Sequence, residues 1–160
     1  MPETIPAARF AAAYALLRAA AAVGDHWIQT DHQAVTKGQY DDVPGQSTRA
    51  GRQACAAHVA TYTATQALAL AVGGRVLGVR WSPVRFAAAL ALASGTHLLA
   101  DRRRPLQAMA EAVGAGGFYR FGAPRPGRDD NPSLGTGAYA LDAAWHHGWE
   151  AAAALILAGS

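Results

Sequence analysis

The sequence predicts an all-α protein, an up-down-up-down four-helix bundle in a single domain that spans residues 1–160. Alanine and leucine, two strong helix formers, dominate the chain, and no segment alternates apolar and polar residues over the length of a strand. Capping residues, prolines and glycines divide the chain into four long apolar segments. With 51% apolar residues, the 160-residue chain is large enough for one hydrophobic core.

The main helices are expected at about Pro6–Val35, Ser47–Val72, Pro83–Arg103 and Thr136–Ala158. Gly38, after Lys37, ends the first helix, because glycine readily takes the conformation that follows a helix. Ser47 or Thr48 caps the second helix, and Gly73 with Gly74 closes it. These signals predict a connection of about ten residues between the first two helices.

The second half of the chain has equally clear punctuation. Ser82 precedes Pro83, a capping residue before a proline at the first helical position, so the third helix begins there. A shorter helix is expected over Pro105–Val113, ended by Gly114. From Gly114 to Gly135 the chain is rich in Gly, Pro and Arg, which predicts a long loop between the third and fourth main helices.

Polar residues recur one helical turn apart within the apolar helices: Asp25 with Gln29, His97 with Asp101, and Asp142 with His146. Carboxylates are rarely buried without a counter-charge or a metal. In an antiparallel bundle these pairs, together with His58, fall within roughly 5 to 15 Å of the same end, given the helical rise per residue. The helices therefore bring their polar residues to one level.

A divalent metal site is the function that this arrangement favours most. The orders His97-Asp101 and Asp142-His146 are opposite, so in antiparallel neighbours the two histidines lie level and the two aspartates lie level. Imidazoles and carboxylates suit Zn, Mn or Fe. The predicted ligands are Asp25, His58, His97, Asp101, Asp142 and His146. A metal-free network of ion pairs and hydrogen bonds, or unrelated exposed residues, are the alternatives.

Four residues beside these ligands are candidates for orienting the ligand side chains without binding the ion themselves: His26, Gln29, Arg102 and His147. His26 and His147 are rotated about 100° from the shared face, so a surface position is equally compatible with the sequence. Arg102 begins a run of three arginines at a helix C-terminus, where cations are favourable, and the same run could clamp a phosphate.

Composition excludes several classes of protein. The single Cys55 allows no intrachain disulfide and no multi-cysteine zinc site. The chain has no Walker loop, dinucleotide fingerprint or nucleophile elbow. Its net charge of +3 is concentrated in clusters at Arg102–Arg104 and Arg120–Arg128, which could meet nucleic acid, acidic lipid or a phosphorylated substrate.

Two locations stay open, a membrane or the cytoplasm. Gln53–Gly74 is about 20 residues long without a formal charge but carries His58 and Gln66, and the other helices are interrupted by charged or histidine residues. A mean hydropathy of +0.04 is low for a chain of spanning helices. If the chain enters a membrane, the basic residues of the connections at the site end predict that this end faces the cytoplasm.

Four segments, in order along the chain, resemble an uncharacterised bacterial family, the domain of unknown function 3307: residues 24–31 with Lys37 and Gly38, then 56–62, then 96–102, and finally 139–142 with 145–147. The resemblance implies a small multi-helix membrane protein with His/Asp motifs and no assigned activity. Family members often carry a histidine one turn before the first aspartate, where this chain has Ala21. The resemblance thus implies one ligand fewer here.

Three functions follow from these patterns. The first is a metal-binding bundle acting as a metal-dependent hydrolase on a phosphate-bearing or lipid-like small molecule, with a bound water as nucleophile and nearby arginines holding the anion. The second is a noncatalytic membrane or regulatory module whose buried polar cluster fixes helix packing. The third is a nucleic-acid-binding regulator that uses the basic loop.

Overall fold

The computed structural model describes residues 6–124 and 135–159, and within those ranges the chain is helical and has no strand. The all-α expectation is confirmed. The elements are α1 (Pro6–Val23), η1 (Gly24–Ile28), α2 (Asp31–Thr36), α3 (Thr48–Val76), α4 (Pro83–Asp101), α5 (Arg104–Ala112), α6 (Gly116–Tyr119) and α7 (Gly137–Ala158).

The prediction that Pro6–Val35 forms one continuous helix is wrong. The α-helical turns end at Val23, and η1 is a π-helical turn in which the amide of Gln29 donates to the carbonyl of Gly24 at 3.0 Å. A new short helix then begins after Thr30, whose hydroxyl accepts from the amide of Gln33 while the Gln33 side chain accepts from the amide of Thr30. The chain therefore changes direction just beyond Asp25.

The second predicted helix was expected to close at Gly73 and Gly74, but α3 runs on to Val76. Both glycines lie where another side chain approaches the helix closely. A Cβ at Gly73 would collide with the Leu16 side chain of α1, and one at Gly74 would lie 2.6 Å from Nε1 of Trp81. These glycines therefore permit close packing and do not end the helix.

The other boundaries lie within a few residues of those expected, with one addition. The loop predicted from Gly114 to Gly135 contains the short helix α6. Residues 125–134 of this loop, including Arg125 and Arg128 of the basic cluster, lie outside the described residues.

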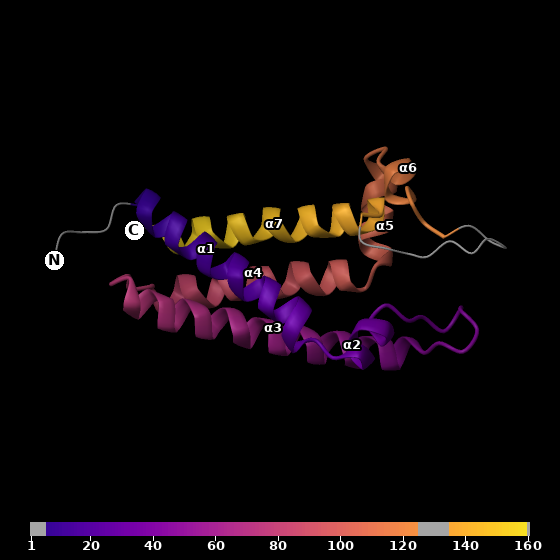
Figure 1. Ribbon diagram of the computed structural model, residues 1–160, viewed down its shortest axis with the longest axis horizontal. Helices are drawn as coiled ribbons and strands as arrows, with labels where there is room; N and C mark the ends of the chain where they lie inside the picture. The colour runs from indigo at the N-terminus through magenta and orange to yellow at the C-terminus, as the bar shows by residue number, and fades with distance from the viewer. Residues whose placement is uncertain (1–5, 125–134, 160) are drawn as a thin grey trace.

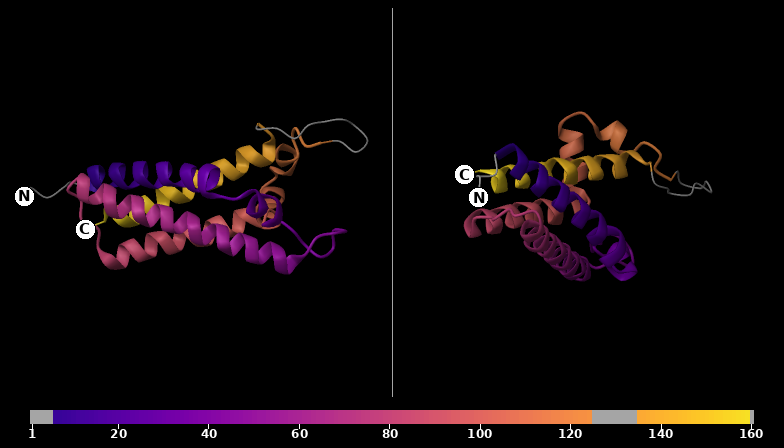
Figure 2. Two further views of the ribbon diagram at one scale, coloured as in Figure 1. Left: turned by 60° about the horizontal axis from the view of Figure 1, so that its bottom comes forward. Right: turned by 60° about the vertical axis from the view of Figure 1, so that its left-hand side comes forward.

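Four long helices surround one core, and each contacts two others: α1 packs on α3 and α7, and α4 packs on α3 and α7. Figure 1 shows α1 and α4 running away from the termini while α3 and α7 run back toward them. Figure 2 shows α5 and α6 projecting at the end remote from both termini. The main apolar cluster joins all four long helices and consists of Ala13, Leu17, Leu70, Ala89, Ala93, Ala153, Ala154 and Leu157. Small alanines let these helices pack closely.

A polar network crosses the interior beside this core. Arg18 of α1 forms an ion pair with Glu150 of α7 at 3.0 Å, and Glu150 also accepts a hydrogen bond from the hydroxyl of Tyr62 on α3. Gln66, one turn further along α3, donates to the same hydroxyl. Burial raises the pKa of Glu150 above its ordinary value, although Arg18 and Tyr62 act against the shift. The network therefore ties three long helices together.

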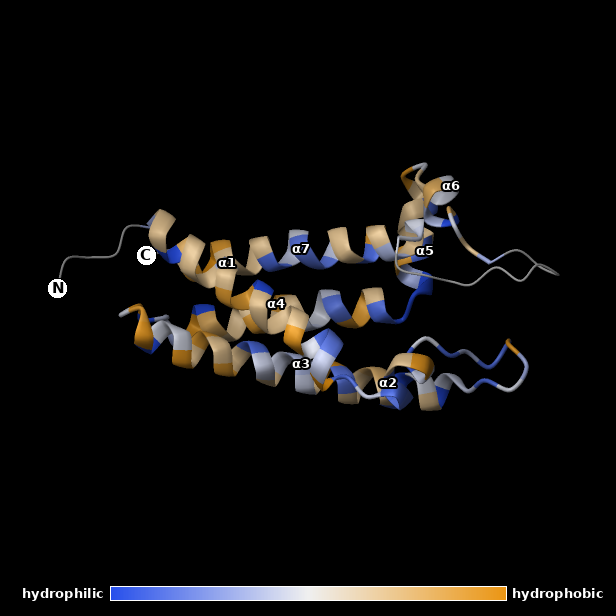
Figure 3. Ribbon diagram, in the orientation of Figure 1, coloured by the Kyte–Doolittle hydropathy of each residue, from blue (hydrophilic) through white to orange (hydrophobic). Residues whose placement is uncertain are grey.

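Two helical segments, Pro6–Ile28 and Pro83–Asp101, are long and apolar enough to cross a membrane by length and composition. Buried core helices of soluble proteins meet the same criterion, so the finding is weak. Figure 3 shows mostly apolar residues in α1, α4 and α7 toward the termini, and more polar ones toward the opposite end. Membrane insertion, with the site end in the cytoplasm, stays a prediction.

Candidate metal centre

Four of the predicted ligand residues meet where η1, α3 and α4 come together. Asp25 lies in the π-helical turn, His58 is on α3, and His97 and Asp101 lie one turn apart on α4. Gly24 allows η1 to approach α3, because a Cβ at this position would lie 3.0 Å from Cδ2 of Tyr62. A π-helical turn frequently accompanies a functional site, since the added residue redirects the side chains within it.

One oxygen of each aspartate lies close to the paired Nε2 atoms of the two histidines. The Nε2 atoms of His58 and His97 are 3.0 Å apart. Nε2 of His58 lies 3.2 Å from Oδ1 of Asp25 and 3.3 Å from Oδ2 of Asp101. Nε2 of His97 lies 3.5 Å from the same Asp25 oxygen and 3.1 Å from the same Asp101 oxygen.

These separations suit a tetrahedral ion. Four donors placed about 2.0 to 2.2 Å from a zinc-like ion lie about 3.3 to 3.6 Å from one another. The five measured separations fall between 3.0 and 3.5 Å. Two nitrogen and two oxygen donors are also a common ligand set for divalent transition metals. Asp25, His58 and His97 form one group of three donors that could hold an ion.

Unsatisfied oxygens in the same place support a cation. Oδ1 of Asp25 and Oδ2 of Asp101 are buried and have no hydrogen-bond partner, although imidazole nitrogens lie within 3.5 Å. The contacts are close, but the ring N–H directions do not make them hydrogen bonds. Buried carboxylate oxygens without partners are costly, and a divalent ion at their centre would satisfy both.

Lys37 supplies a positive charge to one side of this cluster. Its Nζ lies 2.8 Å from Oδ1 of Asp101, the oxygen that faces away from the histidines. Burial alone would raise the pKa of Asp101, but His97 and Lys37 more than offset it and hold the pKa below its ordinary value. Burial lowers the pKa of His97, which favours the neutral ring that can bind a metal.

The two predicted ligands on α7 lie beside this centre. The ring of His146 packs against that of His97 in a tilted arrangement with centroids 4.4 Å apart, and the ring of Tyr62 packs against His97 in the same way at 3.8 Å. His146, His97 and Asp101 form a second group whose ligand atoms lie within 4.8 Å of one another. Asp142 contacts Nε2 of His146 at an ion-pair distance of 3.6 Å. The expected alignment of the two histidines is therefore present.

A polar cavity of about 520 Å³ opens beside the cluster. Asp101 and Asp142 line it, together with the cations Lys37 and Arg103 and the aromatic side chains of Tyr119 and Tyr139. The cluster is thus not sealed by packing on every side. A small polar molecule in this cavity would reach the carboxylates of Asp101 and Asp142.

The four residues expected to support the ligands take different positions. His26 and His147 are exposed. Gln29 caps η1, and its side-chain nitrogen is buried without a hydrogen-bond partner. Arg102 is buried and donates to the carbonyls of Lys37 and Gln39, so its guanidinium holds the chain that carries Lys37. Ala21, at the place of the family's histidine, is buried and offers no ligand atom.

The arginines around this end are largely engaged with protein groups. Arg102 and Arg104 both stack on Tyr40, Arg104 pairs with Asp42, and Arg120 pairs with Glu111. Nucleic-acid binding through these residues stays a prediction.

Lys37 and Glu150 were missed as interior charges by sequence reasoning. Lys37 was interpreted only as part of a helix end, and its pairing with Asp101 depends on the turn of the chain after η1. Glu150 did carry a signal, because it follows His146 at the one-turn spacing within an apolar helix.

Comparisons of the chain with models of protein families, with curated proteins and with solved structures found no match. The resemblance to domain of unknown function 3307 stays a prediction.

Proposed function

We propose that this protein binds a divalent metal ion and is a metal-dependent hydrolase of small phosphate-bearing or lipid-like molecules. One observation carries the metal half: the Nε2 atoms of His58 and His97 lie within 3.5 Å of one oxygen of Asp25 and one of Asp101, and these two oxygens have no hydrogen-bond partner. The donor set suits Zn, Mn or Fe. The proposal treats the chain as the up-down-up-down four-helix bundle that the sequence predicts.

In this proposal His146 is a further donor, held by Asp142. The carboxylate of Asp142 contacts one ring nitrogen of His146, which leaves the other nitrogen for an ion. A carboxylate behind a metal-binding histidine fixes the ring and increases its basicity. Removing Asp142 would therefore weaken metal binding less than removing His97, which belongs to both groups of candidate ligands.

The hydrolase half is supported by the cavity next to the cluster. A bound metal would supply Lewis acidity and an activated water at neutral pH. Lys37 and Arg103 line the cavity and would hold an anionic group. Asp101 joins the two functions, since one oxygen faces the candidate ion and the other holds Lys37.

The metal half is tested by elemental analysis of protein purified without chelator. The wild-type protein should contain about one transition-metal ion per chain, and His97→Ala and Asp101→Ala should lose most of it. His147→Ala is the matched control, because His147 is an exposed histidine next to His146 on the same helix. Metal content that is low in the wild type and unchanged in His97→Ala would contradict the site.

The hydrolase half needs a separate assay. Zinc- or manganese-loaded protein should hydrolyse an activated phosphoester such as p-nitrophenyl phosphate, and chelation or His97→Ala should abolish turnover while His147→Ala keeps it. Full metal occupancy without hydrolysis of phosphomonoesters, phosphodiesters or carboxylic esters would support metal binding and contradict the proposed hydrolase activity.

A noncatalytic role is the second candidate, and the network of Arg18, Glu150, Tyr62 and Gln66 favours it. This network shows that the fold buries polar groups to join helices where no cavity is required. In this alternative the His/Asp cluster has the same task. His97→Ala would then lower thermal stability without changing metal content.

A further inference from the structure

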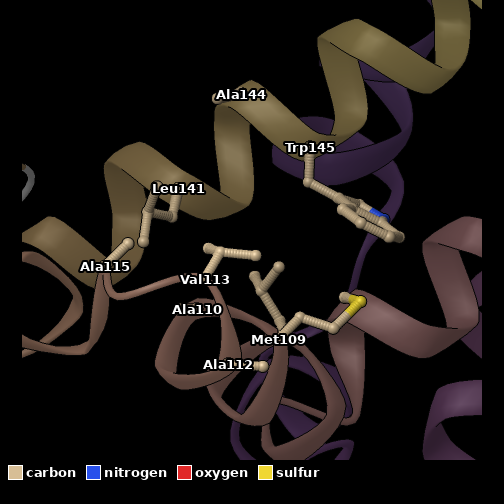
Figure 4. Close-up of a pocket in the computed structure, with 9 residues that line it drawn as sticks. Met109, Ala110, Ala112, Val113, Ala115, Leu141, Ala144 and Trp145 are labelled. Carbon is tan, nitrogen blue, oxygen red and sulfur yellow. The ribbon is translucent and has the colours of Figure 1, made fainter.

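A second cavity, apolar in character, lies between α5 and α7. It has a volume of about 410 Å³ and is formed by α5 and the turn after it on one side and by α7 on the other. Figure 4 shows Met109, Val113, Leu141 and Trp145 pointing into the same space between these helices. Val113 is 79% exposed, which is unfavourable for a large apolar side chain unless something covers it.

The apolar cavity and the polar cavity are neighbours. Leu106 lines both of them, so the two spaces lie on either side of one side chain. On α7, Leu141 and Trp145 line the apolar cavity, and each is followed directly by a residue of the cluster region, Asp142 or His146. The helix thus presents an apolar face and a polar face to two adjoining spaces.

The charges of the polar cavity favour an anion once a metal is present. Its described lining has two cations, Lys37 and Arg103, and two carboxylates, Asp101 and Asp142, which balance one another. A divalent ion at the cluster would make the lining net positive. Arg103 has an unusual backbone conformation, with φ at 61°, and its side chain lies across Gly38 and donates to the carbonyl of Ala34. An anionic group is the complement of this lining.

We infer that the ligand of this protein is a monomeric amphiphile with one alkyl chain and a small anionic head, of the alkyl phosphate class. The head lies in the polar cavity beside the cluster, and the chain passes Leu106 into the apolar cavity between α5 and α7. The placement of the anionic head rests on the proposed metal site, whereas the placement of the alkyl chain rests on the apolar cavity alone.

Hydrolysis of such a ligand is balanced by one water molecule. The water oxygen forms a new bond to phosphorus as the ester P–O bond breaks, a proton from the water passes to the departing alkoxide, and the products are the alcohol and inorganic phosphate.

The test is calorimetric binding of octyl phosphate and ethyl phosphate, which share a head and differ by six methylenes. A fully buried methylene strengthens binding roughly fourfold. Because the cavity is open on one side, wild-type protein should bind octyl phosphate at least about tenfold more tightly than ethyl phosphate. A ratio near one in protein that binds zinc would overturn the inference and leave the proposed function intact.

Two alanines of α5 provide a matched pair of variants. Ala112 lines the apolar cavity and Ala108, one turn earlier, does not, and both are exposed. Ala112→Phe should fill the cavity and bring the ratio of the two affinities, octyl phosphate over ethyl phosphate, to within about twofold of one. Ala108→Phe should keep the wild-type ratio. Ala144→Phe, on the α7 side, is a second filling variant. Equal ratios in all variants would overturn the inference.

Two further measurements distinguish binding of the alkyl chain from metal binding and from binding to a membrane. His97→Ala should weaken binding of both phosphates but keep the ratio, because the apolar cavity is unchanged. If the wild-type protein binds no zinc but still binds octyl phosphate more tightly than ethyl phosphate, the proposed metal function would be contradicted and the alkyl-binding cavity would be supported. Sedimentation with phosphatidic acid vesicles, without binding of monomeric octyl phosphate, would show a membrane-binding face and overturn the inference.

Discussion

Asp101 occupies a position in which both carboxylate oxygens have defined surroundings. Oδ1 accepts from Lys37, and Oδ2 faces the nitrogens of His58 and His97. Because Asp101 is almost fully buried, its charge depends on these neighbours and not on water. The residue therefore links the stability of the fold to the chemistry of the cluster.

Lys37→Met should destabilise the metal-free protein by about 3 kcal/mol, because it leaves the Asp101 carboxylate buried without a counter-charge. Saturating zinc should reduce this loss, since the ion replaces the missing positive charge. Denaturant unfolding with and without zinc measures both values.

Arg104→Met is the control for this substitution. Arg104 and Asp42 form an ion pair in which the side chains are 47% and 65% exposed, so the loss should be much smaller than that of Lys37→Met and should not depend on zinc. Similar losses for the two variants would mean that the Lys37–Asp101 pair is as solvated as a surface pair.

At the scale of elements, the π-helical turn η1 determines where Asp25 lies. It ends the first long helix early, packs on α3 through Gly24, and sends the chain toward Lys37. An uninterrupted helix would rotate the residues after Asp25 differently. The segment is thus a junction that serves the cluster and the connection to α3.

Gly24→Ala should lower the affinity for zinc about tenfold, because the new methyl group would lie 3.0 Å from Cδ2 and 3.4 Å from Cα of Tyr62 and push η1 away from α3. The free energy of unfolding should fall by about 1 kcal/mol. Competition with a zinc-binding dye measures the affinity.

Gly95→Ala is the matched control on α4, two residues before His97. A Cβ at Gly95 meets no heavy atom within 4 Å, and alanine is favoured over glycine inside a helix by about 0.5 to 1 kcal/mol. This variant should be slightly more stable with unchanged zinc affinity. The same affinity in both glycine variants would show that Asp25 does not depend on the position of η1.

For the whole molecule, the candidate metal centre joins η1, α3 and α4, so metal binding should stabilise the entire fold. A free metal concentration about 100 times the dissociation constant adds about 2.7 kcal/mol. In a domain of this size that corresponds to a rise of about 5 to 10 °C in melting temperature. Calorimetric melting of zinc-loaded protein before and after chelation measures the difference.

The same experiment has internal controls. His147→Ala should respond to chelation like the wild type, while His97→Ala should melt at one temperature in both conditions. If chelation left the wild-type melting temperature unchanged, the cluster would stabilise the fold through its own contacts and not through an ion.

The sequence alone predicts the all-α class and the approximate positions of the long helices, because helix propensity, caps and proline act over a few neighbouring residues. It also predicts that Asp25, His58, His97, Asp101, Asp142 and His146 gather at one level, which follows from helix rise and chain direction. The structure brings five of these residues into two groups that share His97, and Asp142 contacts His146. These inferences need only local rules and the alternation of helix direction.

Tertiary structure decided the rest, because each remaining feature depends on groups far apart in the chain. Gly24 in the π-helical turn lies against Tyr62, and the last turns of α3 at Gly73 and Gly74 lie against Leu16 and Trp81. Lys37 meets Asp101, and Arg18 meets Glu150, only after the helices have packed. The apolar cavity between α5 and α7 likewise has no counterpart in any single segment. Local sequence specifies helices, whereas the distances within a site come from how those helices fit together.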